Sequence, residues 1–149
     1  MIFEIQNLTK RRISEDFIKK IIHTTAQFEG RDKNGNISMG LALVGRARMQ
    51  ALNWRYHKKD RATDVLSFSG GEGFIAPKNY GEYLGEIIVC PQVIQKQASH
   101  IKVSFEREFS HILIHGILHL FGYSHKGSLE AVYNLHAKEE KIISRIFSG

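Results

Sequence analysis

Three histidines and a glycine near the C-terminal end constrain this chain more than any other feature. His115 and His119 are four residues apart, a spacing that returns two side chains to nearly the same face of a helix. Gly122 stands where that helix should end, because glycine readily takes the left-handed conformation that reverses the chain. The reversal can bring His125 back toward the pair. We therefore expect the three imidazoles to meet at one point.

Imidazoles that meet at one point are typical of a metal site. Three neutral imidazoles leave the fourth position of a tetrahedral zinc ion to water, which distinguishes a catalytic site from a closed structural one. We predict one Zn²⁺ bound by His115, His119 and His125. Nickel, copper and iron also accept imidazole ligands, so the donor set alone does not identify the metal.

The other potential ligands are predicted to have structural roles. His111 lies one helical turn before His115 and should be about 6 Å further from the metal, as a structural residue or as a neighbour of a ligand. Cys90 lies in an apolar strand, where a buried thiol is the commoner state. Three more histidines lack ligand spacing and are expected to be ordinary residues: His23, His100 and His136.

The same stretch has the zinc spacing of metzincin proteases, H-x-x-x-H-x-x-G-x-x-H. Those enzymes need a glutamate immediately after the first histidine as the general base. Here that position is Gly116. Peptide hydrolysis would lack its proton acceptor, so we do not expect a protease.

Positive charge is concentrated in residues 46–61, which we call the basic segment. The chain has 21 lysines and arginines against 15 acidic residues, giving +6, which favours a polyanionic partner. Trp54 and Tyr56 lie among these charges, a mixture that single-stranded nucleic acid uses for phosphate neutralisation and base stacking. The alternative is a solvated helix face with Trp54 turned into the core. The predicted RNA-binding residues are Arg46, Arg48, Arg55, Lys58, Lys59 and Arg61.

The length and pattern of the chain predict one α+β domain over residues 1–149. No repeat or linker divides the 149 residues. Strands are expected early and helices late, as a small mixed sheet packed with about five helices, the histidine pair lying on a central helix. Strands are expected in 1–7, 37–45, 63–69 and 83–90, helices in 14–30, 46–57, 93–100, 105–120 and 129–147, and a loop in 70–81.

The chain is expected to be cytoplasmic. A single cysteine fits a reducing compartment. No apolar run is long enough to span a membrane, and the first residues do not resemble a secretory signal.

Residues 115–125, HGILHLFGYSH, resemble the signature of the YbeY family of bacterial single-strand-specific endoribonucleases, H-G-x-L-H-L-x-G-Y-D-H. Leu52-Asn53, the TDVLSF of 63–68 and the LGEI of 84–87 resemble it in the same order, so the resemblance covers about half the chain. It implies an α+β fold, zinc on the three histidines, and a role in maturing the 3′ end of 16S ribosomal RNA and in ribosome quality control. Single-stranded RNA, ribosomal RNA and ribosomal subunits are the partners it implies.

Three positions depart from the family pattern. Ser124 stands for the usual aspartate before the last histidine, and Glu86 stands for the aspartate of LGDI. His57 stands for an arginine that follows the family's tyrosine. Arg55 and Lys58 flank His57 and could supply the missing positive charge.

We predict metal-assisted cleavage of an RNA phosphodiester. Zinc lowers the pKa of its bound water toward about 7 and can polarise a phosphoryl oxygen. Arg55, His57 or Lys58 would neutralise developing charge, and Asp64 could orient a ligand imidazole by accepting its other N–H. The pattern leaves open whether water or the 2′-hydroxyl attacks, which RNA site is cut, which metal the cell supplies, and the oligomeric state.

Two other functions fit parts of the pattern. A non-catalytic ribosome-assembly factor would use zinc for stability and the basic segment for binding ribosomal RNA. A metal-dependent hydrolase of a small molecule would use the metal without the basic segment. Cleavage of RNA, and its dependence on those charges, separates the three functions.

Overall fold

The computed structural model describes residues 2–31, 37–70, 82–124 and 127–148. Its described helices and strands confirm the expected α+β class. In chain order they are β1 (Ile2–Asn7), α1 (Glu15–Phe28), β2 (Ile37–Leu43), α2 (Arg46–His57), β3 (Val65–Ser69), β4 (Glu82–Val89), α3 (Pro91–Ile101), α4 (Phe105–Leu120) and α5 (Leu129–Phe147). The loop expected in 70–81 lies outside the described residues except for Gly70.

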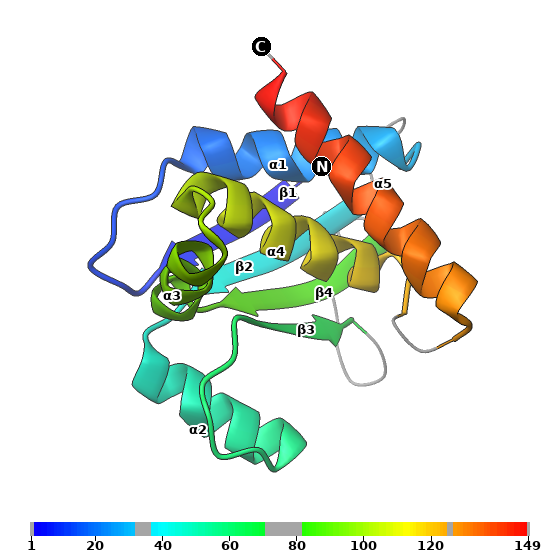
Figure 1. Cartoon of the computed structure of the whole chain (residues 1–149). Coiled ribbons are helices and arrows are strands. Elements are labelled where there is room, and N and C mark those ends of the chain that lie inside the picture. The colour runs from blue at the N-terminus through cyan, green and yellow to red at the C-terminus, as the bar shows by residue number, and fades with distance from the viewer. Residues whose placement is uncertain (1, 32–36, 71–81, 125–126, 149) are drawn as a thin grey trace.

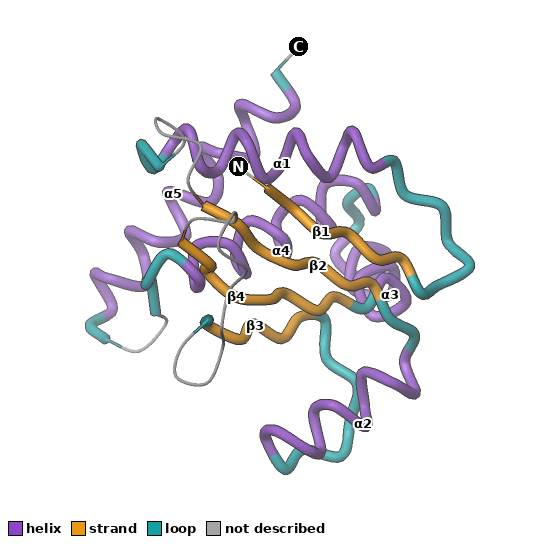
Figure 2. The backbone as a smooth tube through the Cα atoms, turned by 180° about the vertical axis from the view of Figure 1, so that it is seen from behind, coloured by secondary structure: helices purple, strands orange, loops and turns teal. Residues whose placement is uncertain are grey.

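The four described strands form one mixed sheet in the order β1-β2-β4-β3. The pairs β1–β2 and β2–β4 are parallel, whereas β3 runs antiparallel to β4 at one edge. The helix α1 connects the parallel strands β1 and β2, as a crossover between parallel strands requires. Figure 2 shows the four strands side by side, with α2 beyond the β3 edge.

The main hydrophobic core lies between one face of the sheet and the helices α1, α3, α4 and α5. Figure 1 shows α4 crossing in front of the sheet, with α1 above it and α5 beside it. Eleven of the 16 residues of α4 are buried, which makes it the central helix of this layer. A smaller cluster under α2 contains Val44, Met49, Leu66 and Cys90, so the thiol is buried as expected.

Serine hydroxyls cap three of the described helices. The Ser14 hydroxyl accepts from the Phe17 N–H at 3.3 Å, and Ser104 and Ser128 cap α4 and α5 in the same way. The helix α3 begins at Pro91 rather than at Val93. Proline is favoured in the first turn, where its missing N–H would have no helical partner, so it starts the helix instead of preceding it. Among the described residues, no helix is both long and apolar enough to cross a bilayer.

Gly116 brings α4 close to the sheet. A methyl group built on Gly116 would lie 3.1 Å from Ile87 Cγ2, 3.3 Å from Ser67 Oγ and 3.4 Å from Val65 Cγ2. A side chain at this position would therefore point into the β3–β4 edge of the sheet. A glutamate there would face the sheet, which strengthens the sequence argument against a protease.

We expect Gly116→Ala to destabilise the fold by about 1 kcal/mol. Alanine gains about 1 kcal/mol of helix propensity, but overpacking a fully buried site costs about 1–3 kcal/mol, and Ile87 is 0% exposed. Urea unfolding followed by circular dichroism measures the change. An unchanged or raised free energy of unfolding would show that the side chains of β3 and β4 shift easily to accommodate the added methyl group.

Candidate metal centre and basic segment

Two imidazole nitrogens face each other on α4. The Nε2 atoms of His115 and His119 are 3.1 Å apart, and the ring centroids are 4.7 Å apart. Both side chains lie one turn apart on the rim of a largely buried helix, as the spacing predicts. Two nitrogens bound to a tetrahedral zinc at 2.0–2.1 Å would lie about 3.3 Å apart. The pair is therefore spaced for a metal ion.

A buried carboxylate from α5 determines which nitrogen of His115 carries the proton and which presents a lone pair. Glu139 is 2% exposed, and its Oε2 lies 3.0 Å from His115 Nδ1. A carboxylate can only accept this hydrogen bond, so Nδ1 carries the proton and Nε2 presents a lone pair toward His119. Such carboxylate–histidine contacts orient ligand imidazoles and raise their basicity.

Hydrogen bonds with Glu29, just after α1, and with Lys138 on α5 hold the turn that follows α4. Gly122 has φ +105°, the reversal expected for a glycine at this position. The Tyr123 hydroxyl donates to Glu29 at 3.1 Å and accepts from Lys138 Nζ at 2.6 Å, and Lys138 pairs with Glu29 at 2.9 Å. Burial lowers the pKa of Lys138, but the Tyr123 hydrogen bond and Glu29 outweigh it and raise that pKa. His125 itself lies outside the described residues.

An open pocket of about 370 Å³ lies beside the histidine pair. Its lining residues come from the start of β3 and from α4 and α5: Asp64, Val65, His111, Ile112, His115, Val132, His136 and Glu139. Asp64 lies on this wall, and its hydrogen bond with a side chain comes from Thr63 at 3.3 Å. The role proposed for Asp64, accepting the second N–H of a ligand imidazole, is filled at His115 by Glu139.

Two of these residues, His136 and Glu139, were not predicted from the sequence to belong to the site. His136 was expected to be ordinary, yet its ring centroid lies 6.2 Å from that of His111. Glu139 follows His136 by three residues on α5, a spacing that places both on one helix face. A search for histidine–carboxylate pairs at helical spacing would have found them.

The basic segment forms α2 and the loop that leads to Asp64. All six of its lysines and arginines are exposed, as RNA binding requires. Trp54 is 54% exposed and Tyr56 is 52% exposed, so the alternative that turned Trp54 into the core is wrong. Met49 supplies the buried face of α2 instead, at 0% exposure.

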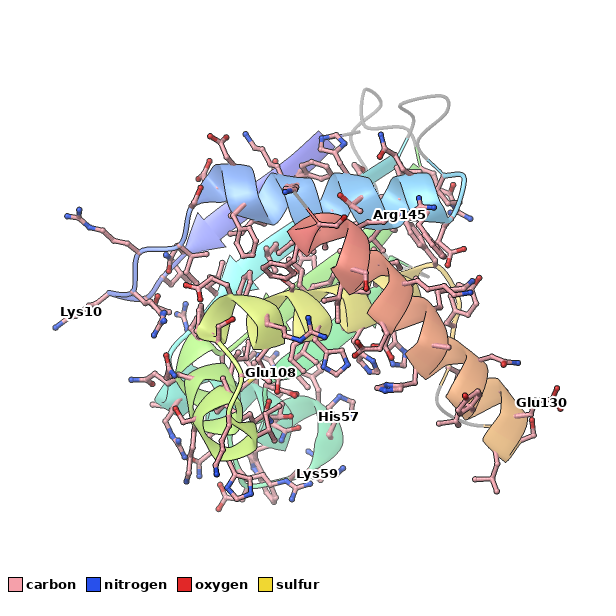
Figure 3. All side chains as sticks on the ribbon, turned by 45° about the horizontal axis from the view of Figure 1, so that its top comes forward. Lys10, His57, Lys59, Glu108, Glu130 and Arg145 are labelled. Atoms are coloured by element: carbon pink, nitrogen blue, oxygen red, sulfur yellow. The ribbon has the colours of Figure 1, made fainter. Side chains whose placement is uncertain are left out.

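Cationic and aromatic groups alternate along the exposed face of α2. Lys58 Nζ lies 5.7 Å from the Trp54 ring centroid, and the Arg55 guanidinium lies 5.5 Å from that of Tyr56. The Tyr56 ring also packs on Phe68 of β3, with centroids 4.9 Å apart. Figure 3 shows His57 and Lys59 together at the end of α2. This surface offers both charges and open ring faces.

Glu86, one of the positions that depart from the family pattern, lies away from the histidines. It is exposed on β4 next to the buried Ile87, and it packs beside Gly40 of β2. Burial and the nearby Glu86 and Glu4 carboxylates raise the pKa of Tyr83 to about 12. Glu86 lines a different pocket from the one beside His115, together with Glu4 and Gly40.

Comparison with known proteins gives a consistent result. The family model described as endoribonuclease YbeY matches residues 4–147. An endoribonuclease YbeY of Neisseria gonorrhoeae is 47% identical over 88 residues, which cover 58% of this chain and 52% of the relative's own length. That of Acinetobacter baumannii is 34% identical over 130 residues, covering 87% of this chain and 81% of the relative.

The fold also has a relative among solved structures. The solution structure of a Thermotoga maritima protein has a TM-score of 0.65 and 25% sequence identity, covering 98% of this chain and 89% of that one. The curated relatives are named endoribonucleases, in agreement with the RNA-cleaving class predicted from the histidine signature. The match of the family model over residues 4–147 and the shared architecture lead to one conclusion: the chain belongs to the endoribonuclease YbeY family.

Proposed function

We propose that this chain is a zinc-dependent endoribonuclease of single-stranded RNA. The separation of 3.1 Å between the Nε2 atoms of His115 and His119 carries this proposal. The Glu139 contact leaves His115 Nε2 without a proton, so the two nitrogens repel unless a cation or a proton lies between them. His125, two residues after Tyr123 in the sequence, is the third proposed ligand.

The proposed division of labour follows from the positions of the residues. A zinc ion held by the three histidines would supply Lewis acidity toward a phosphodiester oxygen. Glu139 orients the His115 ring, while Asp64 lines the pocket that the substrate would enter. Arg55, His57 and Lys58, exposed at the end of α2, are proposed to neutralise charge on the RNA. Trp54 and Tyr56 offer ring faces to unpaired bases.

The biological setting is proposed from the family. Ribosomal RNA is the proposed substrate, with maturation of the 16S 3′ end and ribosome quality control as the processes served. We propose that residues 1–149 act as a single domain in the cytoplasm, in contact with ribosomal subunits.

His119→Ala tests the metal centre. Removing one of three ligands should release zinc and abolish RNA cleavage while the fold persists, because His119 lies on the rim of α4. Zinc content of the purified protein, circular dichroism and cleavage of an end-labelled single strand measure the three effects. His100→Ala, an exposed histidine on α3, is the matched control and should retain both zinc and activity.

Zinc retained in full by folded His119→Ala would contradict the ligand assignment. Loss of folding in His119→Ala, together with parent protein that binds zinc and RNA but cleaves nothing, would instead favour an assembly factor with a structural metal. The ends of the cleavage products identify the nucleophile. A cyclic phosphate or 3′-phosphate means attack by the 2′-hydroxyl, and a 3′-hydroxyl means attack by water.

The basic segment is tested by a paired charge removal. In Arg55→Gln/Lys58→Gln, the slope of log K for single-stranded RNA against log salt should fall by about 1.4, because each phosphate contact contributes about 0.7. Lys19→Gln/Lys20→Gln removes equal charge from exposed positions on α1 and should leave the slope nearly unchanged. Fluorescence anisotropy at several salt concentrations measures both. Equal slopes for the two variants would exclude α2 as the RNA surface.

A further inference from the structure

A second group of potential metal ligands lies on the wall of the same pocket. One ligand atom each from His111, His136 and Glu139 lie within 4.8 Å of one another. His111 belongs to α4, and the other two belong to α5, where they are three residues apart. None of the three is among the ligands proposed for the first metal ion.

The buried carboxylates around this group favour the binding of a cation. Glu108 is 6% exposed and Glu139 is 2% exposed. Within the described residues, both carboxylates have ion-pair partners only among histidines, and neither pairs with a lysine or an arginine. Burying a carboxylate is costly unless positive charge or several hydrogen bonds compensate for it.

His111 lies between these two carboxylates. Its Nδ1 is 3.0 Å from Glu108 Oε1, and its Nε2 is 3.5 Å from Glu139 Oε2. A neutral imidazole has one N–H and can satisfy only one of them. With the proton on Nδ1, at the shorter contact, a lone pair on Nε2 faces an oxygen that already accepts from His115. Positive charge at Nε2, supplied by a bound cation or by a second proton on the ring, would resolve this arrangement.

We propose that His111, His136 and Glu139 bind a second divalent cation. Imidazole nitrogen together with carboxylate oxygen suits transition metals such as zinc, cobalt and manganese, and suits magnesium poorly. His136 is exposed, so an ion can enter from the pocket without opening the core. Asp64 lies on the same pocket wall and offers a further oxygen.

Glu139 connects the two sites. Its Oε2 accepts from His115 Nδ1 and also faces His111 Nε2. The second ion would withdraw negative charge from the carboxylate that orients a ligand of the first. It would also add positive charge to the pocket that the RNA phosphate would enter. The effect on RNA rests on the proposed function, whereas binding of the second ion does not.

The number of bound ions tests the proposal. Metal-free protein is titrated with Co²⁺, and bound metal is counted after equilibrium dialysis. We expect two equivalents for the parent protein, one for His136→Ala, one for His119→Ala and none for the double variant. His136 is exposed, so its substitution should leave the circular dichroism spectrum unchanged. His100→Ala is the control and should bind two equivalents.

A second readout identifies the ligands of each ion. In His119→Ala loaded with Co²⁺, the imidazole NMR signals of His111 and His136 should shift or broaden strongly, whereas that of His100 should not. One equivalent in both the parent protein and His136→Ala would overturn the second site. Two equivalents in His119→Ala, with one in His136→Ala, would uphold the second site and contradict the ligand set of the proposed nuclease.

Discussion

Two imidazole nitrogens face each other at the edge of α4, and much of the surrounding structure holds them there. The Nε2 atoms of His115 and His119 are 3.1 Å apart, and the buried Glu139 keeps the proton of His115 on its other nitrogen. Because His115 Nε2 presents a lone pair, this separation is favourable only when a proton on His119 Nε2 or a cation lies between the two nitrogens. The fold tolerates the arrangement because α4, which carries both rings, packs on the sheet and on α1, α3 and α5. A metal ion bound by both nitrogens would replace that proton.

The two sides of helix α4 have different surroundings, one apolar and one polar. Its buried side must be apolar and tightly packed, and Gly116 allows that side to approach β3 and β4 closely. Its other side must hold imidazoles against carboxylates that are largely removed from water. Helix α5 contributes Glu139 to the polar side and, at the same time, supplies Ile142, Ile143 and Ile146 to the core. The polar centre is therefore held by the same packing that stabilises the domain.

The parts of the fold that could be predicted from sequence are those governed by local patterns. The bounds of α2, α4 and α5 agree with the ranges expected from the sequence pattern, and the histidine pair follows from four-residue periodicity. The position of Glu139 could not be derived in this way, because α5 is separated from His115 by the turn, and only tertiary packing brings the two together. Asp64 was expected to be able to orient a ligand imidazole by accepting its other N–H, whereas the carboxylate that contacts His115 is Glu139 of α5. Exposure of Trp54 likewise depended on which face of α2 the sheet covers.

The contact between Glu139 and His115 affects when the site can form during synthesis of the chain. Chains are made from the N-terminus, so β1 to α4 exist before α5 is available to dock. Until α5 packs, His115 lacks the carboxylate that selects its tautomer, Glu29 lacks Lys138, and the pocket lacks one wall. A chain interrupted before α5 would keep its basic segment and its histidine pair but lack this organised centre. For the proposed ribonuclease, made by the ribosomes whose RNA it would process, catalytic competence would then arrive only with the last described helix.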